Sequence, residues 1–176
     1  PHHGEHRRIE RARRSGRRLI IAGNVPDAHR AWFQANVAPH IDDDKVRYLG
    51  PVNDVQKNEL LGSAAGFLMP ILWEEPFGIV MAEAMACGTP VLGLRRGAVP
   101  EVVVDGVTGF VADTADELTA AVARIGTLSR HNVRARVESV DSADAVASGY
   151  LDVYSKMLAR NSASRKQVAA RAGSTS

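Results

Sequence analysis

The chain has 176 residues, of which 45% are hydrophobic and 24% charged, and its formal net charge at pH 7 is +2. This composition is that of an ordinary globular protein with room for one domain. No apolar run approaches the ~18 residues that a membrane-spanning helix needs. The single cysteine, Cys87, excludes an internal disulfide, so a reducing, cytoplasmic location is expected.

The N-terminal segment, residues 1–18, contains seven arginines. A charge run of this kind is typical of a solvated helix face. Because almost no aromatic residues that could stack on bases lie between the arginines, we expect no nucleic-acid binding.

Strands and helices are predicted to alternate along the rest of the chain. Short apolar runs indicate strands near residues 18–22, 45–49, 66–69, 90–93 and 108–111. Helices are expected at residues 27–38, 53–63, 79–87, 113–127, 131–140 and 143–159. The alternation predicts an α/β fold, a Rossmann-like three-layer α/β/α sandwich with a parallel sheet, which one further strand would extend to six strands. We expect one domain over residues 1–160 and a frayed or disordered tail at 161–176.

An acidic triplet, residues 42–44, precedes the second expected strand. Its pattern matches an Asp-x-Asp metal site. Aspartates are also common in turns, where their side chains bond to the backbone. The position between a helix and a strand favours the turn, and no metal site is expected.

The most informative stretch begins at Glu75. A loop leads into Gly78, and residues 79–87 contain neither Gly nor Pro until Gly88 ends the run, which indicates a helix. Glu83 is the only charged residue of this helix, which we expect to be buried all round. Its carboxylate must therefore meet an internal partner or a ligand in a cleft. Two carboxylates suit sugar hydroxyls, and the helix N-terminus suits a diphosphate.

The segment from Glu75 to Glu83, Glu-Pro-Phe-Gly-Ile-Val-Met-Ala-Glu, continues as Ala-Met-Ala-Cys-Gly-Thr-Pro-Val. It resembles the Glu-x7-Glu motif of retaining glycosyltransferases of the GT-B fold, family 4, also called group 1. Further segments resemble this family in the same order, at residues 19–23, 46–52, 97–103 and 105–111. The resemblance covers residues 2–126.

The resemblance implies the C-terminal, donor-binding half of such an enzyme, with the N-terminal acceptor domain missing and the fragment inactive by itself. The implied substrate is a nucleotide-diphosphate sugar, used for retaining glycosyl transfer without a cofactor or metal. Glu83 is expected to bind the ribose hydroxyls, and Glu75 to reach the donor sugar as the catalytic residue. Residues around the helix start and in a loop against the base complete the implied substrate site: Phe77, Gly78, Ile79, Val80, Leu49, Gly50, Pro51 and Val52.

Several alternatives stay open. The chain could be a sugar-nucleotide 2-epimerase-like domain, which shares the fold, or a non-catalytic nucleotide-binding or interaction module. Glu83 could belong to an internal salt bridge. Arg95 and Arg96 could face an anionic ligand or a partner domain, or be solvated surface. The open interdomain face could allow homo-association, and the full-length enzyme could associate peripherally with a membrane.

Overall fold

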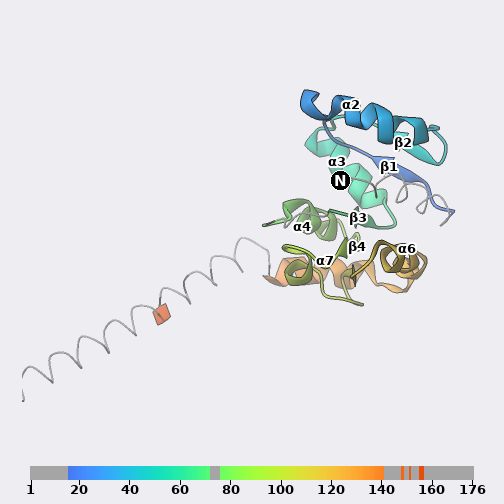
Figure 1. Ribbon diagram of the computed structural model, residues 1–176. Coiled ribbons are helices and arrows are strands. Elements are labelled where there is room, and N and C mark those ends of the chain that lie inside the picture. The colour runs from blue at the N-terminus through green and yellow to red at the C-terminus, as the bar shows by residue number, and fades with distance from the viewer. Residues whose placement is uncertain (1–15, 72–75, 141–147, 149–150, 152–154, 157–176) are drawn as a thin grey trace, which may run out of the picture. The chain divides into compact units, whose positions relative to one another are not determined.

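Short parallel strands form the framework of the chain in the computed structural model (Figure 1). The structure describes residues 16–71, 76–140, 148, 151 and 155–156. The strands are β1 (Leu19–Ile21), β2 (Val46–Tyr48), β3 (Phe67–Met69), β4 (Val91–Leu94) and β5 (Gly109–Ala112). β1 pairs with β2, and β4 lies between β3 and β5, with every pairing parallel. The predicted α/β fold with parallel strands is therefore confirmed.

The strands are divided between two sheets. One sheet contains β1 and β2, the other contains β3, β4 and β5, and the described residues form no ladder between β1 and β3. The six-stranded sheet that the sequence suggested includes a strand that is not among these five.

The helices lie where the sequence predicted them, with ends shifted by a few residues. They are α2 (Asp27–Asn36), α3 (Asp54–Ser63), α4 (Ile79–Ala86), α6 (Ala115–Arg124) and α7 (Arg130–Val140), with the 3-10 turns η1 (Ala38–His40) and η2 (Ile125–Thr127). A further short helix, α5 (Val99–Val102), lies where the sequence predicted neither a helix nor a strand. Pro100 occupies the second helical position, where its missing N–H leaves no intrahelical bond unmade.

Side chains set two of the element boundaries. The Asn53 side chain accepts a hydrogen bond from the Gln56 N–H at 2.9 Å, and the Gln56 side chain accepts one from the Asn53 N–H at 3.0 Å. This capping box starts α3. Before β2, Asp42 Oδ1 accepts hydrogen bonds from the backbone N–H groups of residues 44–46 at 3.1, 2.7 and 2.9 Å. The prediction that the acidic triplet forms a turn is therefore confirmed.

The larger core lies where α6 packs against β4 and β5. It contains Leu92, Leu94, Phe110, Ala112, Leu118, Ala121, Val122 and Ile125. Because side chains alternate along a strand, Gly93 faces the other side of β4. There a Cβ on Gly93 would lie 2.7 Å from Val99 Cγ1, so α5 packs closely on that face. α4 contacts β3 and β4, and the three-stranded sheet is thereby covered on both faces.

A second core lies between α2 and the sheet of β1 and β2. Val37 and Val46 are buried there, and the partly buried side chains of Leu19, Ile21, Trp32, Phe33 and Ile41 pack against them. Trp32 is therefore part of a core.

Two compact units make up the chain, Pro1–Ala135 and Arg136–Ser176. All the named strands belong to the first unit. In the second, residues 148, 151 and 155–156 are helical, within the range where the sequence predicted a helix. The rest of that range, the arginine-rich residues 1–15 and the expected tail at 161–176 lie outside the described residues. In the described part of the chain, no helix has the length and apolar character needed to cross a membrane.

Arg130, the first residue of α7, joins the C-terminal ends of two helices. Its guanidinium donates hydrogen bonds to the carbonyl oxygens of Gly62 and Ala64 at 2.8 and 2.6 Å and of Cys87 at 3.3 Å. It also donates to Thr89 Oγ1 at 2.9 Å. Helix C-termini present carbonyl groups without intrahelical partners and a partial negative charge. Arg130 therefore satisfies the ends of α3 and α4 together.

Replacing Arg130 with methionine is expected to lower the free energy of unfolding by about 1–3 kcal/mol, because hydrogen bonds from a charged donor are lost. Urea unfolding of the variant and the wild type measures the difference. Arg47→Met is the control, since Arg47 is also exposed and its change removes the same charge. Equal losses in both variants would contradict the role of Arg130.

Candidate functional site

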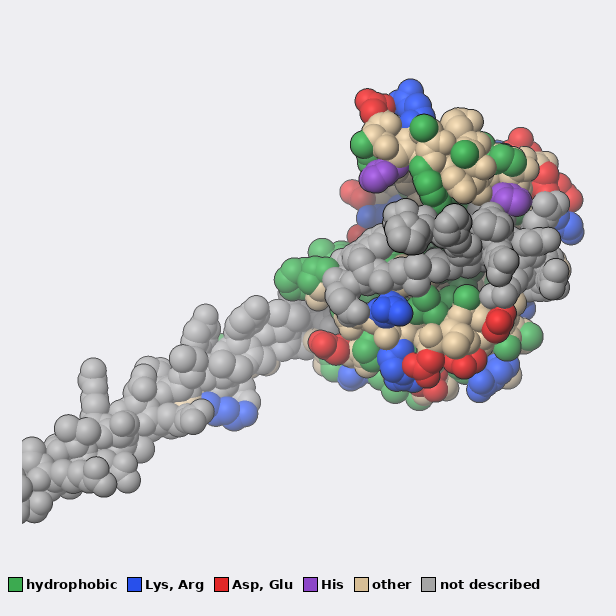
Figure 2. Space-filling model, viewed as in Figure 1, with side chains coloured by type: hydrophobic (Ala, Val, Ile, Leu, Met, Phe, Trp, Pro, Cys, Tyr) green, Lys and Arg blue, Asp and Glu red, His purple; other side chains and the backbone are tan. Residues whose placement is uncertain are grey.

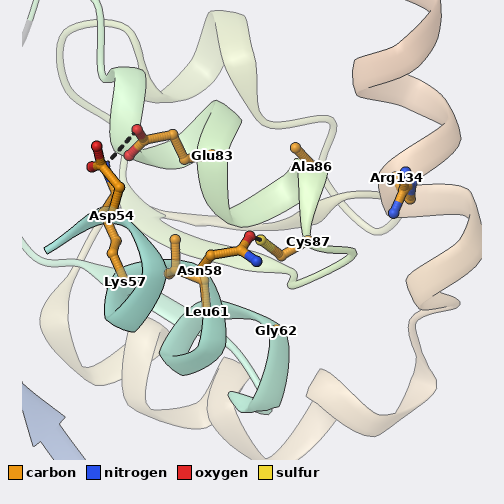
Figure 3. Close-up of a pocket in the computed structure, with 9 residues that line it drawn as sticks. All are labelled: Asp54, Lys57, Asn58, Leu61, Gly62, Glu83, Ala86, Cys87 and Arg134. Atoms are coloured by element: carbon orange, nitrogen blue, oxygen red, sulfur yellow. Dashed lines mark hydrogen bonds and ion pairs between the residues drawn. The ribbon is translucent and has the colours of Figure 1, made fainter.

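Glu83 lies on α4 beside the first turn of α3. Its Oε1 accepts a hydrogen bond from Lys57 Nζ at 2.7 Å, and the same ammonium lies 3.2 Å from Asp54 Oδ1 (Figure 3). The Lys57 side chain is 33% exposed and that of Glu83 is 36% exposed. The structure thus supplies the internal partner that the sequence left open. The pair is at the surface, so the carboxylate remains accessible to a ligand.

A pocket of about 540 Å³ opens beside this ion pair (Figure 3). Its lining comes from α3, from the end of α4 and from one residue of α7: Asp54, Lys57, Asn58, Leu61, Gly62, Glu83, Ala86, Cys87 and Arg134. The Cys87 thiol donates to Asn58 Oδ1 at 3.2 Å across the same gap. The pocket is lined by groups of both charges and by small side chains, a setting that admits a polar ligand.

The two carboxylates alter the titration of the cation between them. The hydrogen bond from Lys57 to Glu83 raises the pKa of Lys57 above its ordinary value of 10.5, and the hydrogen bond to Asp54 is the second cause. Partial desolvation lowers this pKa and so acts in the opposite direction. A lysine whose pKa is higher in the folded state than in the unfolded chain stabilises the folded state. This contribution is complete at pH values below the pKa of the unfolded chain. That contribution disappears as the pH rises through the folded pKa, above 10.5. The Lys57 ammonium is therefore charged at neutral pH.

The start of α4 provides the second part of the site. Gly78 adopts a left-handed conformation with φ of 61°. The helix begins at the next residue, Ile79, as the sequence predicted. The first N–H groups of a helix have no intrahelical acceptor, and they carry a partial positive charge. Ile79 and Val80 therefore present backbone donors that suit an anionic group.

The expectation that α4 is buried all round is wrong. Phe77 is 76% exposed and Ile79 is 70% exposed. In Figure 2, hydrophobic side chains protrude on the left of the unit that contains the strands, where Figure 1 draws α4. Only Met81, Ala84 and Met85 of this helix are buried. One face of α4 packs against the sheet, and the start of the helix is exposed.

The loop expected to lie against the base, residues 49–52, connects β2 to the cap of α3. Gly50 has a φ of 69°, and its carbonyl accepts a hydrogen bond from the Gly23 N–H at 2.9 Å. The Leu49 N–H donates to the Ile21 carbonyl at 2.9 Å. These bonds tie the loop to the end of β1, directly before the helix turn that carries Lys57. The fold therefore places the loop and Glu83 at the two sides of one helix start.

The remaining sequence candidates are Glu75, Arg95 and Arg96. Glu75 lies outside the described residues. Arg95 Nε pairs with Asp113 Oδ1 at 2.8 Å in an exposed ion pair, and Arg96 is exposed. In the described part of the chain, no group of three or more His, Cys, Asp or Glu side chains could hold a metal ion.

Lys57 is the site residue that sequence reasoning missed. It is 26 residues from Glu83 in the chain, and nothing in its local pattern distinguishes it from a solvated helix lysine. A signal did exist, because a single carboxylate in an otherwise apolar helix suggests a cation or a ligand beside it. That signal does not say which of the chain's cations lies beside Glu83.

Comparisons with known proteins identify relatives of this chain. The family model described as glycosyl transferases group 1 matches residues 6–128. A phosphatidyl-myo-inositol mannosyltransferase of Mycobacterium leprae is 34% identical over 158 residues, 86% of this chain and 40% of that protein. An N-acetyl-alpha-D-glucosaminyl L-malate synthase of Bacillus anthracis is 40% identical over 100 residues, 56% of this chain and 25% of that protein.

Solved structures show the same fold. A glycosyltransferase involved in avilamycin A biosynthesis superposes with a TM-score of 0.68 and 29% identity, covering 90% of this chain and 49% of that one. The Anabaena protein HepE, in complex with UDP and glucose, gives a TM-score of 0.70 at 20% identity, covering 87% and 45%. The chain thus spans less than half the length of each of these four proteins.

Proposed function

Because this chain belongs to the glycosyl transferases of group 1, we propose that it forms the donor-binding site of a retaining enzyme of this family. The substrate of the site is a nucleotide-diphosphate sugar. The enzyme transfers the sugar to an acceptor with retention of configuration.

The observation that carries this proposal is the position of the Glu83 carboxylate. It lies in a pocket wall, partly exposed, between the first turn of α3 and the middle of α4. A carboxylate accepts hydrogen bonds from two adjacent hydroxyls, and such charge-assisted bonds are stronger than neutral ones. A ribose offers this pair of hydroxyls. Glu83 therefore binds the ribose of the donor.

The neighbouring backbone completes the proposed site. The N-terminus of α4, at Gly78, Ile79 and Val80, holds phosphate oxygens, since helix N-termini favour anions. Residues 49–52 lie against the base. Phe77 flanks the sugar and phosphates, and Glu75 reaches hydroxyls of the donor sugar. The helix dipole offsets part of the diphosphate charge, so the proposal needs no metal.

The relatives do not agree on one sugar or one acceptor. One is named a mannosyltransferase acting on phosphatidyl-myo-inositol, and another an N-acetylglucosaminyl L-malate synthase. The proposal is therefore limited to the nucleotide-diphosphate sugar, the part of the substrate that Glu83 and the start of α4 contact. HepE, which shares the fold, was solved with UDP and with UDP-glucose, so UDP is the first probe to test.

The test is a binding panel on the chain with UDP-, GDP- and ADP-sugars, read by thermal unfolding and calorimetric titration. A ligand at about 100 times its Kd stabilises the native state by about 2.7 kcal/mol. For a chain of this size this raises the unfolding midpoint by roughly 5–10 °C. We expect one nucleotide to produce this shift and to saturate at one site per chain. No saturable binding by any member of the panel would refute the proposal.

A further inference from the structure

Lys57 lies between two carboxylates at the edge of the proposed ribose site. Its ammonium is 2.7 Å from Glu83 Oε1 and 3.2 Å from Asp54 Oδ1. Asp54 and Lys57 belong to the first turn of α3, which the capping box of Asn53 and Gln56 fixes. The lysine thus connects a rigid helix start to the carboxylate on α4.

This contact restricts the Glu83 side chain before any ligand arrives. A free glutamate side chain samples several rotamers, and ordering it on binding lowers the affinity. Lys57 holds one carboxylate oxygen, Oε1, at hydrogen-bond distance. The ordering is therefore achieved in the unliganded protein, and the orientation of the second oxygen, Oε2, is set as well.

Lys57 also changes the charge of the pocket wall that contains Glu83 and Asp54. Without it, the Glu83 and Asp54 carboxylates would have no cation between them, and both would repel a diphosphate. Its positive charge offsets the Glu83 charge without removing the hydrogen-bond acceptors that a hydroxyl requires. The same side chain therefore orients Glu83 and reduces its repulsion of an anionic ligand.

We infer that Lys57 is a positioning residue for the proposed donor site: it holds the Glu83 carboxylate in the orientation that accepts the ribose hydroxyls. This inference rests on the proposed function. Lys57 acts through Glu83, so its removal changes how strongly the site depends on ribose hydroxyls.

The experiment compares UDP with 2′-deoxy-UDP, or the matching pair for whichever nucleotide binds in the panel, by calorimetric titration. Lys57→Met keeps the apolar stem and removes the charge. We expect it to weaken UDP binding about two- to tenfold, the effect of leaving one side chain to be ordered on binding. We also expect it to reduce the preference for UDP over 2′-deoxy-UDP. Lys57→Arg, which keeps a cation at this position, should retain part of the UDP affinity and part of the preference for UDP over 2′-deoxy-UDP.

A double variant tests whether Lys57 acts through Glu83. In the Glu83→Gln background, Lys57→Met is expected to weaken UDP binding no further, because the group it positions has already been changed. Lys45→Met is the matched control, since Lys45 is exposed and precedes β2, at the other end of that strand from residues 49–52. It should leave the affinity and the ribose preference unchanged.

A measurement without ligand checks the ion pair itself. NMR titration of the Lys57 side chain is expected to show a pKa above the ordinary lysine value, because of the hydrogen bonds to Glu83 and Asp54. Glu83→Gln should lower that pKa. An unchanged pKa would contradict the pairing and overturn the inference.

The outcomes separate the two proposals. If UDP binds and Lys57→Met keeps the full ribose preference, the positioning role is refuted and the donor site stands. If the losses of Lys57→Met and Glu83→Gln add, Lys57 contacts the nucleotide directly, which also refutes it. If no nucleotide binds to the wild type, the proposed function fails, and the positioning role fails with it.

Discussion

Replacing Glu83 with glutamine is expected to weaken nucleotide-diphosphate binding about tenfold or more. The change keeps the size of the side chain but turns charge-assisted hydrogen bonds to the ribose into neutral ones. Hydrogen bonds to a charged group contribute ~1.5–3 kcal/mol, against ~0.5–1.5 kcal/mol for neutral ones, and ~1.4 kcal/mol is a tenfold change. Calorimetric titration with UDP, or with the nucleotide that the panel selects, measures the loss.

The stability of Glu83→Gln is expected to change little. The variant leaves Lys57 without one carboxylate, but that side chain is one-third exposed and keeps Asp54 beside it. A cation in contact with water is not stranded in the way a buried one is. Urea unfolding of the same sample tests this expectation.

The matched control is Glu59→Gln, because Glu59 is an exposed carboxylate on α3 outside the pocket lining. It should leave both affinity and unfolding midpoint unchanged. If Glu83→Gln instead keeps full affinity and lowers the midpoint, Glu83 has only a structural role in the pair with Lys57.

Replacing Gly109 with alanine is expected to prevent stable folding or to lower the free energy of unfolding by roughly 3 kcal/mol or more. A Cβ at this position would lie 1.8 Å from the Val91 carbonyl oxygen and 2.9 Å from Val103 Cγ1. Gly109 is the partner of Val91 in the parallel pairing of β4 and β5. Because the closest atom belongs to the backbone of a buried central strand, it cannot move aside as a flexible side chain would.

Gly62→Ala is the matched control for this prediction. Gly62 is in α3, and a Cβ there would meet nothing within 4 Å. Since alanine favours a helix over glycine by up to about 1 kcal/mol, this variant should be as stable as the wild type or slightly more so. Circular dichroism and urea unfolding compare the two variants. A Gly109→Ala protein with wild-type stability would contradict the close packing of β4 against β5.

The sequence predicted the features that depend on neighbouring residues. Asn53 predicts a helix start because its side chain can accept a hydrogen bond from a backbone N–H of the first turn, and in the structure Gln56 returns such a bond. Gly78 predicts the start of α4, and Asp42 lies in a turn because its side chain reaches the next N–H groups. These effects act over a few residues, so the order of residues alone determines them.

Exposure along α4 was misjudged for a reason that is not local. An apolar composition indicates burial only if something covers every face of the helix. In the described part of the chain, β3 and β4 contact α4, while Phe77 and Ile79 at its start remain exposed. The residue types of α4 do not encode which elements will pack against it.

The sequence by itself determined the alternation of strands and helices, their parallel arrangement and the two helix starts that frame the site. Periodicity, glycine and capping residues act within one turn or one strand, and parallel pairing follows from the alternation. Only the tertiary structure decided that Lys57 meets Glu83 and that Arg130 joins the ends of α3 and α4. The partners in these contacts are 26 to 68 residues apart. They meet because the sheet and its helices are packed in one particular way, and no local pattern selects one cation among several with the same chemistry.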